Sequence, residues 1–143
     1  MSGSRTSLVA LVGTLAVVAS VTASAGEKQA TASDTPRYDV RAEYVVKATV
    51  AGIKTHESVM GYQDMHVILT TTVGDMEVHL GPVSYLAKRG FELKPGDEVV
   101  VTGCKTTWED HPVIVARNLK AGNRSITLRN TNGKPAWPKN QVS

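Results

Sequence analysis

The sequence predicts an all-β domain with one short helix, in which five strands close into a barrel and a short extra strand follows at the C-terminal end. Two observations predict this fold. Apolar and polar residues alternate along several short segments that are separated by glycine, proline and asparagine turns. One helical segment, over residues 82–89, stands between the third and fourth strands. A helix in that position is typical of an OB-like five-stranded barrel.

The first predicted strand covers residues 42–53. One face of this strand carries Tyr44, Val46, Ala48 and Val50, and the other face carries Val45, Lys47 and Thr49. The following segment, residues 54–64, has neither a helical nor a strand period and contains Gly61. It is predicted to be a loop that is long for a hairpin, and long loops are where function tends to lie.

The second and third strands form a predicted hairpin within residues 65–80. With a turn at Val73-Gly74, Leu69 lies opposite Val78 and the apolar rows of both strands coincide. The same register places His66 and His79 as diagonal neighbours on the other, non-core face.

The helix and the next turn carry local stop and start signals. Pro82 suits the first helical position, with Gly81 before it as the cap. Gly90 is a left-handed stop, after which Phe91 can fold back as in a Schellman closure. Residues 94–97 (KPGD) have proline and glycine at the central positions of a type II turn.

The C-terminal half supplies the remaining strands. The fourth strand is predicted over residues 98–106, and residues 108–110 turn the chain. The fifth strand opens at His111, and a short extra strand covers residues 125–129. Residues 42–130 are therefore the barrel, and residues 131–143 are a C-terminal tail.

The N-terminal residues read as a secretory signal. Arg5 gives a positive start, residues 8–18 are mainly apolar, and Ala23-Ser24-Ala25 has the small-residue cleavage pattern. Residues 1–25 are thus predicted to be a signal peptide cleaved near Ala25, and residues 26–41 a flexible linker. The mature protein is expected in the periplasm or secreted, with no stable membrane anchor after cleavage.

Charge and cysteine content narrow the function classes. Without the signal the net charge is about +2, and the basic residues are scattered rather than clustered. This pattern disfavours nucleic acid as the partner. The single Cys104 excludes an internal disulfide, and its place in a strand predicts a small buried residue rather than a reactive thiol.

Several motifs together resemble a family of small exported bacterial proteins with an OB-like barrel. The motifs are Leu80-Gly81-Pro82, Tyr85-Leu86, Gly90-Phe91, Lys94-Pro95-Gly96-Asp97, Val101-Thr102-Gly103, Pro112 to Ala116, and Gly133-Lys134-Pro135-Ala136-Trp137. The resemblance covers most of residues 42–137 and implies the barrel fold. The resemblance implies no particular activity, because most members of that family have no assigned activity.

A binding site is expected where OB barrels bind ligands, on the second and third strands beside the first and fourth loops. All four histidines fall in or beside this region. The predicted ligand-binding residues, for an unknown protein or small molecule, are Tyr62, His66, His79, Trp108 and His111. Trp108 could stack on a ligand or cap the barrel end, and Trp137 is expected to anchor the tail.

A metal site is a second hypothesis for the same face. Its candidate ligands are His56, Met60, His66 and His79. Imidazole with thioether suits copper, and imidazole with carboxylate suits zinc. The alternative is that Met65 and Met76 fill the core and that the two strand histidines are half-exposed.

No catalytic constellation is present. The sequence lacks a nucleophile elbow, an HExxH motif and a phosphate-binding glycine loop. It therefore predicts a non-enzymatic, exported or periplasmic OB-fold binding or interaction module. The alternative is a periplasmic copper or zinc binding protein, and the lesser alternative is binding of single-stranded nucleic acid.

Overall fold

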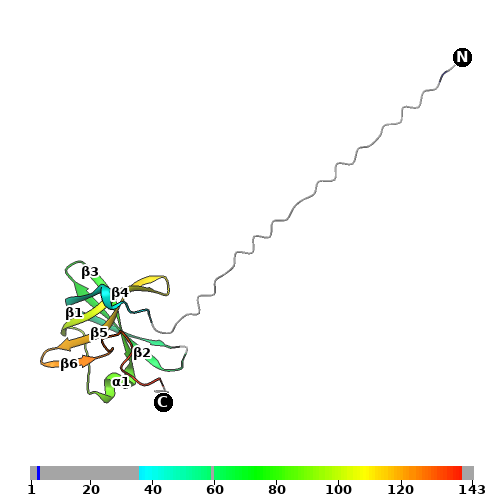
Figure 1. Ribbon diagram of the computed structural model, residues 1–143. Coiled ribbons are helices and arrows are strands. Elements are labelled where there is room, and N and C mark those ends of the chain that lie inside the picture. Colours follow the sequence, from blue (N-terminus) through cyan, green and yellow to red (C-terminus); the bar gives the residue numbers. More distant parts are fainter. Residues whose placement is uncertain (1–2, 4–35, 59, 140–143) are drawn as a thin grey trace.

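A computed structural model describes residues 3, 36–58 and 60–139 of the chain (Figure 1). Apart from residue 3, the predicted signal peptide and residues 26–35 of the linker lie outside the described residues. In the part that the structure describes, no helix is long and apolar enough to span a membrane.

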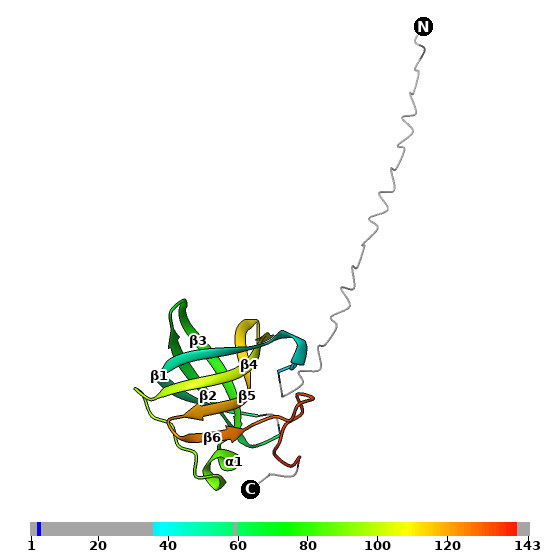
Figure 2. The same cartoon turned by 60° about the vertical axis from the view of Figure 1, so that its left-hand side comes forward.

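Six strands and one short α-helix make up the domain, as the sequence predicts. In chain order the elements are η1 (Val40–Ala42), β1 (Glu43–Glu57), β2 (Gln63–Thr71), β3 (Gly74–Pro82), α1 (Val83–Lys88), β4 (Glu98–Trp108), β5 (His111–Ala121) and β6 (Arg124–Thr127). The sheet order is β3-β2-β1-β4-β5-β6, and a short parallel pairing of β3 with β5 closes the first five strands into a ring (Figure 2). This is the OB-like arrangement.

The ring is filled by aliphatic side chains from the inward rows of its strands. The most deeply buried include Val67, Leu69, Val78, Leu80, Val101 and Leu119. Helix α1 adds Leu86, and its end has the expected closure, in which Phe91 N donates to Leu86 O at 3.0 Å and Gly90 has φ 62°. Met65 and Met76 pack against this core, as the filler interpretation expected.

The first hairpin is longer than its sequence pattern indicates. Strands β1 and β2 stay paired out to Glu57 and Gln63, so residues 54–57 are strand and not loop. Lys54 lies opposite His66, and His56 lies opposite Asp64. The alternation of apolar and polar residues is weak in residues 54–57, because side chains on both faces of β1 are polar at this end of the strand.

The turn of the second hairpin differs by one position from the predicted one. Thr72-Val73 is the turn, because Thr71 pairs with Gly74 and Leu69 with Met76. The Thr71 hydroxyl stabilises this turn, donating to Gly74 O at 2.7 Å and accepting from Val73 N at 3.1 Å. Gly74, with φ 118°, opens β3 rather than completing the turn.

The next hairpin is also tighter than expected. Trp108 belongs to β4 and pairs with His111 at the start of β5, so only Glu109 and Asp110 form the turn. Both turn residues have positive φ, 46° and 63°, the conformation of a two-residue hairpin turn. Strand β6 ends at Thr127, two residues earlier than predicted.

Trp137 anchors the tail by packing on a glycine. A Cβ atom at Gly81, which has φ 133°, would lie 2.5 Å from the Trp137 ring. The indole is buried and lies 5.8 Å from the Tyr85 ring, between ring centroids. Gly81 is thus required by both its backbone conformation and its close neighbour.

Gly81→Ala is expected to lower the free energy of unfolding by about 2–4 kcal/mol, since the methyl group meets the indole and the backbone is strained. Urea unfolding measures this. Gly52→Ala is the matched control, because a Cβ at Gly52 meets nothing within 4 Å, and it should change stability by less than about 1 kcal/mol. Equal losses in both variants would contradict the packing argument.

Candidate functional site

Two histidines lie directly opposite each other on β2 and β3. His66 pairs with His79, next to an irregularity between Met65 and His66, so the pair is direct and not diagonal as expected. Both side chains point away from the ring interior, yet they are 0% and 1% exposed. The expectation of half-exposed histidines is therefore wrong, and the reason is what packs over them.

Trp108 and the remaining histidines cover this outer face. The half-buried Trp108 ring lies 4.8 Å from His66 and 6.5 Å from His79, between ring centroids. His56 and His111 lie 5.4 and 5.8 Å from the same indole. All four histidines of the chain thus surround one tryptophan, in tilted or edge-on ring contacts.

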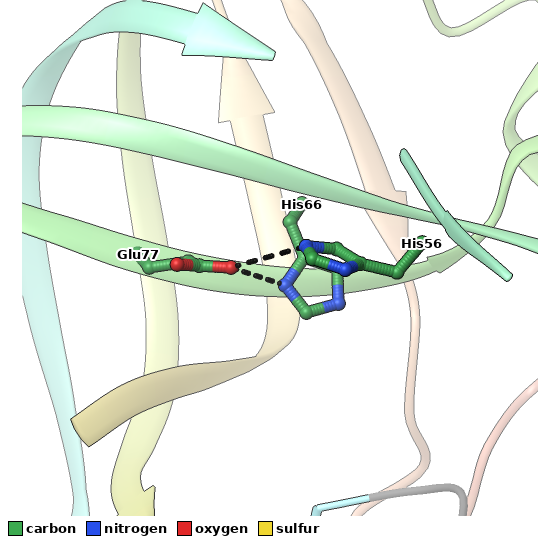
Figure 3. A group of neighbouring side chains, drawn as sticks. All are labelled: His56, His66 and Glu77. Atoms are coloured by element: carbon green, nitrogen blue, oxygen red, sulfur yellow. Dashed lines mark hydrogen bonds and ion pairs between the residues drawn. The ribbon is translucent and has the colours of Figure 1, made fainter. Parts of the chain in front are cut away.

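Glu77 is the residue that connects these histidines. It is half-buried on β3, and His66 Nδ1 donates to its Oε1 at 2.8 Å. His56 Nε2 lies 3.6 Å from the same oxygen (Figure 3). The other oxygen, Oε2, lies 3.5 Å from His111 Nε2 and 3.8 Å from Lys54 Nζ.

Three of these side chains have the geometry of a metal-ligand set, here named the donor triad: His56, His66 and Glu77. Each offers a ligand atom, and the three atoms lie within 4.8 Å of one another. Figure 3 shows both imidazoles turned toward the carboxylate. Two donors bound to one ion at about 2.1 Å are roughly 3.0–3.5 Å apart. The two separations to Glu77 Oε1, 2.8 and 3.6 Å, lie on either side of that range, and all three ligand atoms lie within 4.8 Å of one another.

The electrostatics favour cation binding at neutral pH. Burial, followed by the nearby charge of His79, lowers the pKa of His66 to about 4, although the Glu77 bond acts against this shift. Partial burial acts to raise the pKa of Glu77, but the hydrogen bond and charge of His66 outweigh it, so that pKa is lowered. The site therefore offers a neutral imidazole and an ionised carboxylate, the forms that bind metals.

A second carboxylate–histidine pair lies behind the triad. His79 Nε2 donates to Asp64 Oδ2 at 3.3 Å, and both residues are buried. Several buried atoms nearby have no hydrogen-bond partner among the described residues: His56 Nε2, Asp64 Oδ1, His66 Nε2, His79 Nδ1, and Arg129 Nε and Nη2. Unpartnered buried polar atoms are rare in folded proteins and commonly mark an ion or water site.

The structure separates two predicted residues from this cluster. Met60 is exposed, and with Tyr62 and Trp137 it lines a different hollow, of about 620 Å³, against the C-terminal tail. Because β1 and β2 stay paired through residue 57, the turn tip that carries Met60 points to the tail. Met60, the thioether ligand expected for copper, therefore lies at that hollow.

Glu77 is the residue that the sequence-based ligand sets omit. It is one of thirteen acidic residues, and no motif distinguishes it. The available signal was positional, because Glu77 stands two residues from His79 and so shares its strand face.

The fold and the site together define an OB-like domain with a histidine–carboxylate cluster on the outer face of its β1–β2–β3 sheet. The chain belongs to the MamS/MamX magnetosome protein family, whose model matches residues 44–126. This is a small bacterial family, as the sequence motifs implied.

Comparison with solved structures finds remote likenesses. One is the Stn1–Ten1 complex of S. pombe, with 14% identity and a TM-score of 0.46, covering 57% of this chain and 59% of that chain. Another is the mitochondrial single-stranded DNA binding protein Rim1 of S. cerevisiae, with 8% identity, a TM-score of 0.45, and coverage of 60% and 96%. No curated protein sequence matches the chain.

Proposed function

We propose that this chain is an exported, non-enzymatic binding module whose ligand is a divalent transition-metal ion held by the donor triad. The observation that carries the proposal is the convergence of His56, His66 and Glu77 to within 4.8 Å of one another. Export is supported by the signal-like residues 1–25, and the name of the family places its members with the magnetosome.

The donor set indicates which metals fit. Two imidazoles and one carboxylate are the ligands of open zinc sites and of non-haem iron(II) sites. Without a thioether or thiolate in the set, the triad favours Zn²⁺ or Fe²⁺ over Cu⁺. Hard cations such as Ca²⁺ require six or more oxygen ligands, which the triad does not supply.

Native mass spectrometry of the protein with Zn²⁺, anaerobic Fe²⁺, Cu²⁺ and Ca²⁺ tests the proposal. We expect one Zn²⁺ or Fe²⁺ per chain and no stoichiometric Ca²⁺. His56→Gln should lose the ion yet fold normally, because the His56 side chain is 38% exposed. Asp75→Asn, an exposed change on β3, the strand that carries Glu77, is the matched control and should retain it. Absence of uptake by the unmodified protein, or undiminished uptake by His56→Gln, would refute the proposal.

A further inference from the structure

The two oxygens of Glu77 face different environments. Oε1 lies beside the fully buried His66 and beside His56, which is 38% exposed. Oε2 lies beside His111, which is 40% exposed, and beside Lys54, which is 54% exposed. The carboxylate itself is 14% exposed and lies between these two pairs. One side chain therefore spans the distance between the buried His66 and the surface.

His111 points a specific nitrogen at this carboxylate. Its Nδ1 lies 3.1 Å from the Glu109 carbonyl oxygen, which can only accept, so Nδ1 is the donor. In the neutral ring Nε2 then carries a lone pair, and it lies 3.5 Å from Glu77 Oε2, another acceptor. Lys54 Nζ, 3.8 Å from the same oxygen, already supplies one positive charge there. A proton or a metal ion between Nε2 and Oε2 would join the two acceptors directly.

The position of His111 in the fold suits contact with solvent. It is the first residue of β5, directly after the Glu109-Asp110 turn, and it pairs with Trp108 on β4. The inner donors lie on β1, β2 and β3, so His111 reaches the carboxylate from a different hairpin. It is also the donor next to the acidic turn, where a cation would arrive from solvent.

We propose that His111 is the entry ligand of the metal site, an inference that rests on the proposed function. An arriving ion is first held by His111 Nε2 and Glu77 Oε2, and it then shifts along the same carboxylate to Oε1, His66 and His56. The proton on His66 Nδ1 leaves to solvent as the ion binds there, and the ring takes up one at Nε2, so the imidazole stays neutral. The site is thus built for exchange: the reverse shift passes the ion to a small chelate or to a partner that offers its own ligands.

Rates separate this role from that of a permanent ligand. An entry ligand speeds binding and release alike, so His111→Gln should slow Zn²⁺ uptake and Zn²⁺ release by about tenfold each, the lower end of the range over which association rates vary among variants of one site. The Kd should change by less than about threefold. Asp75→Asn is the matched control, since it removes an exposed carboxylate that lies on β3 outside the acidic turn, and it should leave both rates unchanged.

Stopped-flow mixing measures both rates, with free Zn²⁺ for uptake and an excess of a colorimetric chelator for release. If His111→Gln takes up and releases Zn²⁺ at the rates of the unmodified protein, the entry role is refuted and the proposed function still stands. Faster release with weaker affinity would also overturn the entry role, because His111 would then be a permanent ligand. If the unmodified protein takes up no zinc, the proposed function fails and the entry role fails with it.

Discussion

Acidification from pH 6.5 to pH 4 is expected to destabilise the metal-free protein by on the order of 3 kcal/mol through His66 alone. Burial and the proximity of His79 lower the pKa of His66 from 6.5 to about 4 in the folded state. Between these two values the unfolded chain holds more protons than the folded one. The stabilisation is therefore complete above pH 6.5 and is lost as the pH falls through 4. Glu77, whose folded-state pKa is also lowered, acts in the same direction below its ordinary range.

Urea unfolding at a series of pH values between 4 and 8, with chelator present, measures this loss. The matched variant is His66→Gln, which cannot titrate at this position. Its stability at neutral pH is expected to be lower, but its slope between pH 4 and 6.5 should be flatter than that of the unmodified protein. Identical slopes in the two proteins would show that another group controls the acid response.

Glu77→Gln is expected to weaken Zn²⁺ binding by at least about 100-fold, or roughly 3 kcal/mol. The substitution removes the negative charge that all four cationic or imidazole neighbours share. The fold should survive, because the amide oxygen can still accept the hydrogen bond from His66 Nδ1. Because the glutamine side chain has the same shape and no charge, this variant isolates the contribution of the Glu77 charge to Zn²⁺ affinity.

A competition titration against a zinc chelator of known affinity gives the two dissociation constants. Asp75→Asn removes one carboxylate charge from the same strand, at a side chain that accepts a hydrogen bond from the exposed Thr70 hydroxyl at 2.9 Å. It should bind Zn²⁺ within about threefold of the unmodified protein. An equal loss in both variants would mean that the net charge of the protein, rather than the donor triad, governs affinity.

Local periodicity predicted the ring and the face on which His66 and His79 lie. The hairpin turn is at Thr72-Val73 and not at Val73-Gly74, but this moves the pairings from His66 to the turn by two residues, an even number. Side chains keep their faces under such a shift. The common face of the two histidines consequently does not depend on the exact turn, although their direct pairing does.

The burial of these histidines could not be predicted from the local pattern. Alternation separates the inside of a ring from its outside, but it does not show what covers the outside. His66 is covered by Trp108, which is 42 positions away in the sequence, and by His56, which lies in a segment without a strand period. The role of Glu77 depends on the same long-range packing, because His56, Lys54 and His111 reach it from other strands.

The seam that closes the ring has a consequence for how the site opens. Only two residue pairs, Val78 with Ile114 and His79 with Val115, join β3 to β5. A seam between segments this distant in sequence closes a long loop, and such long-range pairings form slowly in folding. The donor triad lies entirely on β1, β2 and β3, whereas Trp108 and His111 lie on β4 and β5. Transient parting of the seam would therefore uncover the donors without taking them apart, and amide hydrogen exchange along this seam would report how often the site is uncovered.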